Sequence, residues 1–100
     1  MNSSRVFLRV NRVEAALCAK AREATVSDLH EAAAPRGIGG LMSSRMRPIQ
    51  KGARIAGPAV TAFCAPGDNL MMHRALYLAQ PGDVLVVVCD AETSGAQWGD

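Results

Sequence analysis

Hydrophobic residues follow two different spacings along the chain, and each spacing predicts a different kind of element. Val13, Leu17 and Ala21 recur at every fourth position, which is the spacing of one face of a helix. Residues 84–88, VLVVV, instead form an unbroken apolar run that is rich in β-branched side chains. Such a run is typical of a strand buried on both faces.

The amino-terminal pattern predicts two helices. The first begins near Asn11, which is of a residue type that caps helices. The second begins at Thr25, whose side chain can accept a hydrogen bond from the backbone three residues on, and Asp28 stands at the capping-box position. Pro35 and Gly37 are expected to end this second helix.

The remaining pattern predicts a strand–helix–strand unit. A strand is expected over residues 55–64, with a bulge or kink at Gly57-Pro58, and a shorter strand or edge piece at residues 46–49. Asn69 is the expected N-cap of an apolar helix over residues 70–79, which should be covered on more than one side.

The strand at residues 55–64, the helix at residues 70–79 and the apolar run at residues 84–88 together predict a right-handed parallel βαβ crossover. The sequence therefore predicts an α/β fold. A strand buried on both faces needs helices on both sides. We therefore expect the chain to be the first half of a larger α/β domain.

Composition narrows the class of protein. One hundred residues suffice for one small domain, and 49% apolar with 20% charged residues is a globular composition. The net charge of +2 is small and scattered, so we expect no nucleic-acid partner, and no apolar run is long enough for a membrane span. Three widely spaced cysteines, Cys18, Cys64 and Cys89, suit free thiols in a reducing compartment, so a cytoplasmic location is expected.

Three carboxylates, Asp90, Glu92 and Asp100, follow the predicted strand at residues 84–88. Ligands of open α/β sheets bind beyond the carboxyl ends of the strands, and Mg²⁺ takes carboxylate ligands. Gly99, at an expected helix start, would let an anion approach backbone N–H groups. A solvated acidic loop accounts for the spacing equally well, so the spacing alone leaves both interpretations open.

Three stretches in order resemble the RraA-like family, which includes the 4-hydroxy-4-methyl-2-oxoglutarate/4-carboxy-4-hydroxy-2-oxoadipate aldolases. They are TVSD at residues 25–28, GARIAGPAVTAFCAPGDNLMMHRAL at residues 52–76, and PGDVLVVVCDAETSGAQWGD at residues 81–100. The combination is specific, although no single piece is. It divides the chain into an amino-terminal helical segment, residues 1–24, and an incomplete family-like core, residues 25–100.

The resemblance implies the amino-terminal half of a swivelling β/β/α domain, from a protein that assembles as trimers or as hexamers made of two trimers. The family's aldolases are class II lyases, in which Mg²⁺ or Mn²⁺ holds pyruvate oxygens and stabilises the enolate left by carbon–carbon cleavage. Their substrates are small 2-oxo or hydroxy dicarboxylic acids. Many members also decarboxylate oxaloacetate, because that reaction passes through the same enolate.

Gly99 and Asp100 match the first two positions of the family's substrate loop. The resemblance implies that both bind substrate and that Asp100 holds the metal through water. It gives Asp90 and Glu92 no role in the site, so that they are only polar residues of the loop. The family's next strand carries an arginine that binds substrate and an aspartate that ligates metal, and neither is among these 100 residues. No catalytic residue is therefore assigned, and we expect the chain to be inactive alone.

Two alternatives to an aldolase stay open. Founding members of the family inhibit ribonuclease E by protein–protein contact, so a non-enzymatic regulator of RNA processing is one. A structural fragment without activity is the other. The sequence Trp98-Gly99-Asp100 favours the enzyme, since an acid in the substrate loop has no evident purpose in a pure inhibitor.

Overall fold

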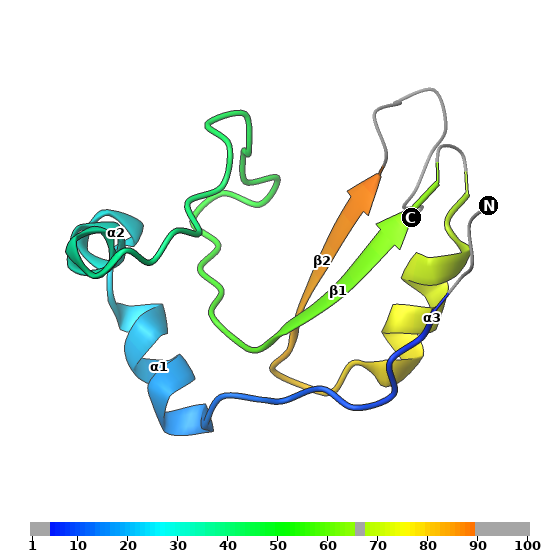
Figure 1. Cartoon of the computed structure of the whole chain (residues 1–100). Helices are drawn as coiled ribbons and strands as arrows, with labels where there is room; N and C mark the ends of the chain where they lie inside the picture. Colours follow the sequence, from blue (N-terminus) through cyan, green and yellow to red (C-terminus); the bar gives the residue numbers. More distant parts are fainter. Residues whose placement is uncertain (1–4, 66–67, 90–100) are drawn as a thin grey trace. The chain divides into compact units, whose positions relative to one another are not determined.

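The computed structural model describes residues 5–65 and 68–89, which belong to two compact units (Figure 1). One unit contains residues 1–13 and 57–100, and the other contains residues 14–56. The first holds the sheet, and the second holds two of the helices. Each unit is described below by itself.

A parallel strand–helix–strand motif forms the first unit. Strand β1 spans Ala59–Cys64, helix α3 spans Leu70–Leu78, and strand β2 spans Val84–Cys89. The strands pair in parallel, with a register that runs from Ala59 opposite Val84 to Cys64 opposite Cys89. This confirms the predicted α/β fold and its parallel βαβ unit.

Helix α3 covers one face of this small sheet. The inward side chains of β1 alternate with exposed ones, so that Val60, Ala62 and Cys64 are buried. Val60 and Ala62 pack with Ala75 of α3, and alternate residues of β2, Leu85 and Val87, join the cluster. The core is thus aliphatic and lies between α3 and one side of the two strands.

The opposite face of the sheet is exposed among the described residues, which differs from the prediction. In β2, Val88 is 52% exposed and the other residues are half-buried, so this strand is not buried on both faces as predicted. Phe63 of β1, on the same face as Val88, is 63% exposed. Helix α3 is also covered on one side, because Leu70 and Tyr77 are exposed. A single helix cannot shield both sides of a sheet, and the described residues of this unit contain no helix besides α3.

The start of α3 corrects a predicted cap. The Asn69 side chain makes no capping hydrogen bond. Asp68 does so instead: its Oδ1 accepts from the backbone N–H of Leu70 at 2.9 Å. The carboxylate lies two residues before the donor and reaches its N–H through a local turn, so Asp68 satisfies one unpaired donor of the first turn.

The Gly57-Pro58 interruption sets where β1 begins. A side-chain carbon at Gly57 would meet the backbone carbonyl of Gly82, so the two backbones pass within a distance that excludes any larger residue. The carbonyl of Pro58 accepts from the N–H of Val84 at 2.8 Å. The strand therefore starts at Ala59, after the predicted kink, rather than at residue 55.

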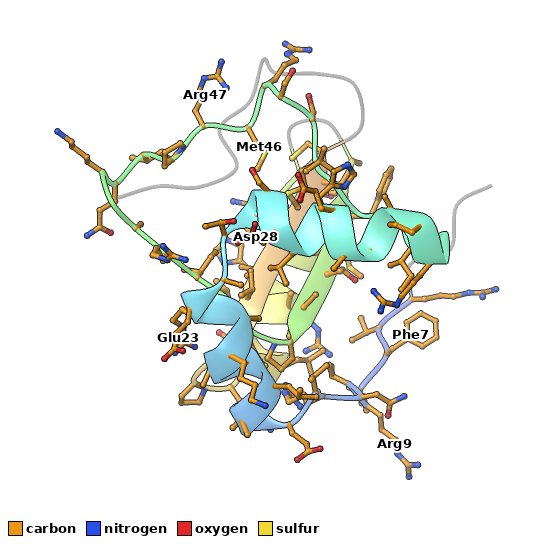
Figure 2. The ribbon with its side chains drawn as sticks, turned by 90° about the vertical axis from the view of Figure 1, so that its left-hand side faces the viewer. Phe7, Arg9, Glu23, Asp28, Met46 and Arg47 are labelled. Carbon is orange, nitrogen blue, oxygen red and sulfur yellow. The ribbon has the colours of Figure 1, made fainter. Side chains whose placement is uncertain are left out.

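Helices α1, Ala15–Glu23, and α2, Val26–Ala33, form the second unit with the short 3₁₀ turn η1, Ala34–Arg36. The predicted cap of α2 is confirmed: the Asp28 N–H donates to Thr25 Oγ1 at 3.1 Å, and Asp28 lies on the first turn (Figure 2). Gly37 ends η1 with a φ of 71°, as a terminating glycine should.

Two local predictions are wrong. Helix α1 has Glu14 as its N-cap, not Asn11. Residues 11–14 are not helical, and within them Arg12 makes an ion pair with Asp83, 71 residues further along the chain. Residues 46–49 form no strand. Met46 closes a turn onto Ser43 instead, and the described residues of this unit contain no strand with which a strand at residues 46–49 could pair.

Arginines tie the long connection that follows α2 back to α1. The Arg54 guanidinium donates to the carbonyls of Arg22 at 3.1 Å and Ala24 at 2.7 Å, which are exposed at the end of α1. Arg22 in turn donates to the carbonyl of Ala56 at 3.0 Å. These bonds satisfy carbonyls that the helix leaves unpaired at its carboxyl end.

Candidate functional site

The carboxyl ends of β1 and β2 form the edge where the sequence predicts a site. Both arrows in Figure 1 point the same way, because the strands are parallel and end together at Cys64 and Cys89. In the sequence, residue 90 comes directly after Cys89, the last residue of β2. Ligands of parallel sheets bind at such an edge, since the loops that follow the strands gather there.

The predicted site residues themselves lie outside the described residues. Gly99 and Asp100, the substrate and metal candidates, belong to residues 90–100, as do Asp90 and Glu92. Their roles stay predictions. Among residues 5–65 and 68–89, no three His, Cys, Asp or Glu side chains gather closely enough to hold a metal ion. The described residues alone therefore do not fit a divalent cation.

One described carboxylate does lie close to this edge. Asp68 follows the loop after β1, but its Oδ1 is already engaged with the N–H of Leu70. A carboxylate has a second oxygen, but the described residues bring no two further His, Cys, Asp or Glu side chains close enough to hold a metal ion with Asp68. We therefore assign Asp68 to the fold.

A hollow of about 930 Å³ lies beside β1 in the same unit. It is bounded by residues 5–11, by β1 and by α3, and its volume is in the range of small-molecule sites. Its charged lining residues are Arg5, Arg9, Arg74 and Asp68. Sequence reasoning missed these arginines, because residues 5–11 carry no recognisable motif and Arg74 lies within a helix interpreted as core.

The lining arginines do not form a defined anion site. Arg5, Arg9 and Arg74 are all exposed, and Figure 2 shows Arg9 and Phe7 extending away from the ribbon. Guanidinium groups in solvent are free to move and hold an anion weakly. The hollow is therefore a positively charged surface beside the candidate edge, without fixed ligands of its own.

The strongest electrostatic feature lies at the other end of β2. Both oxygens of Asp83 face Arg12, whose Nε donates to Oδ1 at 2.9 Å and whose Nη2 donates to Oδ2 at 2.6 Å. The N–H of Gln80 also donates to Oδ2, at 2.8 Å. The Arg12 hydrogen bonds, followed by that of Gln80, lower the pKa of Asp83. This pair lies at the amino end of the strand, so it supports the fold rather than the chemistry.

Comparison with known families finds a match that covers most of the chain. The family described as aldolase/RraA matches residues 24–100, more than three-quarters of the chain. The match begins next to the Thr25 cap of α2 and continues through α3 and β2 to the predicted site residues. It leaves out Arg12 and the amino-terminal segment.

A curated relative points the same way. A protein of Halalkalibacterium halodurans, whose name gives it an inferred 4-hydroxy-4-methyl-2-oxoglutarate aldolase activity, is 37% identical over 59 residues. The aligned part is 59% of this chain and 28% of the relative, so the chain spans less than a third of that protein. No solved structure matches the chain.

Within the residues that the structure describes, no helix has the length and apolar character needed to cross a membrane.

Proposed function

The chain belongs to the aldolase/RraA family, and on this premise we propose that it is part of a divalent-metal-dependent class II aldolase. The proposed reaction cleaves acids of the 4-hydroxy-4-methyl-2-oxoglutarate type and releases pyruvate. The observation that carries the proposal is the family match through residue 100, which includes Trp98-Gly99-Asp100. The inferred activity in the name of the Halalkalibacterium halodurans relative supports the choice of reaction.

In this proposal, Gly99 and Asp100 bind the substrate, and Asp100 also accepts a hydrogen bond from a metal-bound water. A bound Mg²⁺ or Mn²⁺ supplies Lewis-acid polarisation of the 2-oxo acid. The described residues provide the parallel strands whose carboxyl ends meet at Cys64 and Cys89, directly before this stretch of sequence. Ligands that coordinate the metal directly are assigned to residues other than the described ones.

A second activity follows from the same chemistry. Loss of carbon dioxide from oxaloacetate and cleavage of a 4-hydroxy-2-oxo acid both leave electrons next to a polarised keto group. We therefore propose oxaloacetate decarboxylation as a side activity of the same site, with small 2-oxo and hydroxy dicarboxylic acids as the substrate class.

Assembly and location are also proposals. We propose a homotrimer or a hexamer, supported by the exposed apolar side chains of Phe63, Leu70 and Tyr77, which a monomer would leave in water. A cytoplasmic location is supported by three cysteines that are all free, of which Cys64 is buried.

The test is pyruvate release by the protein produced from its own gene. It is supplied with 4-hydroxy-4-methyl-2-oxoglutarate or oxaloacetate, with Mg²⁺ or Mn²⁺ and then with a chelator. Release that needs the cation supports the proposal. Absence of metal-dependent release, together with retention of ribonuclease E on the immobilised protein, would replace the aldolase with the regulator.

A further inference from the structure

We propose that Cys64 and Cys89 are an oxidation site, at which hydrogen peroxide converts the two thiols into a reversible disulfide. The first observation is the register of the sheet. Cys64 and Cys89 are direct partners at the last position of the parallel ladder between β1 and β2. The proposal does not rest on the aldolase function, which uses neither thiol.

Both side chains lie on the same face of the sheet. Residues at every second position of a strand share a face, and directly paired residues of neighbouring strands point to the same side. Leu85 and Val87 pack into the cluster under α3, and Cys89 follows Val87 at the next position of that face. Cys64 follows the buried Val60 and Ala62 in the same way.

The distances suit a disulfide. Neighbouring strands lie about 4.7–4.9 Å apart, and bridged cysteines have Cα atoms about 4.4–6.8 Å apart. Both cysteines are the last residues of their strands. The spacing of paired strands falls within the range for bridged cysteines, so a covalent bond requires the backbone to adjust by no more than a few tenths of an ångström. A bond formed under such constraint is more easily reduced than a relaxed one, which fits a reversible site.

Access for a small oxidant is also present. Cys89 is half-buried, and Cys64, although 1% exposed, lines the hollow beside β1. In the first step the Cys89 thiolate attacks one peroxide oxygen, the O–O bond breaks, and the departing hydroxide takes up a proton to become water. In the second step the Cys64 thiolate attacks the Cys89 sulfenic sulfur and displaces a second hydroxide, which also becomes water. Two thiols are oxidised and one peroxide is reduced to two waters.

The chain offers an internal control in Cys18, which belongs to the other unit. Trypsin cleaves after Lys and Arg, so the three cysteines fall on three separate peptides. These are residues 13–20, residues 55–74, and the peptide that begins at residue 75. A disulfide between any two cysteines therefore has its own mass signature.

The experiment treats the folded full chain with stoichiometric hydrogen peroxide, alkylates the remaining thiols, and maps unreduced tryptic peptides by mass spectrometry. The expected product links the peptide 55–74 to the peptide that begins at residue 75, with Cys18 alkylated. It should exceed any link to Cys18 by at least about tenfold, because the paired strands raise the effective concentration of the two thiols. Dithiothreitol should restore three alkylated cysteines.

Two comparisons make the test decisive. Cys18→Ser should keep the link, whereas Cys64→Ser and Cys89→Ser should lose it. Oxidation in concentrated urea should remove the preference, and this comparison needs no variant to fold. An unlinked product, or links to Cys18 in comparable amount without urea, would overturn the proposal.

Discussion

Arg12 and Asp83 form a bidentate ion pair that joins the amino-terminal segment to the turn before β2. The Nη2–Oδ2 distance is 2.6 Å, and the Asp83 side chain is 3% exposed. Nη2 of Arg12 also donates to the carbonyl of Leu78 at 3.3 Å, at the end of α3. Arg12 lies before the family-matched residues 24–100, and Asp83 lies within them. The pair therefore fastens a segment outside the family match to the βαβ unit.

Removal of this pair should lower stability. Asp83→Asn keeps an acceptor for the Gln80 N–H but removes the charge that Arg12 faces, so we expect a lower thermal midpoint at pH 7, measured by circular dichroism. A well-aligned arginine–carboxylate pair with one partner shielded from water is the kind that contributes to stability. Glu31→Gln, which removes an exposed carboxylate on α2, is the matched control. Equal midpoints for the two variants would contradict this role.

The same pair predicts a pH dependence. Hydrogen bonds from Arg12 and Gln80 lower the pKa of Asp83 in the folded state. The ionised Asp83 side chain therefore stabilises the fold at pH values above its ordinary pKa of 3.8. This stabilisation is lost as the pH falls below that value toward the lower folded pKa. The difference in thermal midpoint between the native protein and Asp83→Asn should therefore be constant from pH 7 to about pH 5 and should shrink below it. If the difference in thermal midpoint instead grew as the pH falls, the prediction that folding lowers the pKa of Asp83 would be contradicted.

The close approach of Gly57 to Gly82 predicts a specific sensitivity to a methyl group. Gly57→Ala would place a side-chain carbon against the Gly82 carbonyl and should cost about 1–3 kcal/mol in the free energy of unfolding. Gly39→Ala is the control, because nothing lies within 4 Å of its added carbon. It should change the free energy by less than about 0.5 kcal/mol. Urea unfolding of both variants checks the prediction, which fails if the two costs are equal.

The cap of α2 gives a third stability test. Thr25→Ala removes the acceptor of the Asp28 N–H and should cost about 1 kcal/mol, together with some loss of helical signal in the far ultraviolet. Ser27→Ala, at an exposed position inside the same helix, should be neutral or slightly stabilising, since alanine is the better helix former. A larger loss for Ser27→Ala than for Thr25→Ala would contradict the cap.

The exposed face of the sheet predicts self-association of the 100-residue chain. Phe63 and Val88 project from the side that α3 does not cover, and two-stranded sheets also leave edges open to pairing. Sedimentation should show species larger than the monomer, and Phe63→Ser should reduce them. Arg45→Ser, a change on the long connection of the other unit, should not. A chain that remains monomeric at high concentration would refute this expectation.

Local patterns predicted most of the fold. The β-branched run at residues 84–88, the apolar helix before it and the Thr25 cap each depend on neighbouring residues, and all three are confirmed. The strand expected at residues 46–49 failed, because a strand needs a partner that local sequence does not specify. The Asn69 cap failed because Asp68, one residue earlier, makes the hydrogen bond.

Long-range contacts could not be predicted in the same way. Arg12 and Asp83 are 71 residues apart, and nothing in either local pattern indicates the other. The Cys64–Cys89 pairing depends on strand register, which hydrophobic pattern and loop geometry fix only once the strands are placed. Gly99 and Asp100 were identified through the family resemblance, because spacing alone did not separate a metal site from a solvated acidic loop.

The most direct test of the proposed aldolase compares Asp100→Asn with Glu92→Gln in the protein produced from its own gene. Each change neutralises one carboxylate in the stretch after β2, but the proposal gives a role in the site to Asp100 alone. With Mg²⁺ present, pyruvate release should fall by about 10–100-fold in Asp100→Asn, as expected for loss of a group that orients a metal-bound water. Glu92→Gln should release pyruvate at the unmodified rate. Full activity in Asp100→Asn, or release that a chelator leaves unchanged, would contradict the proposal.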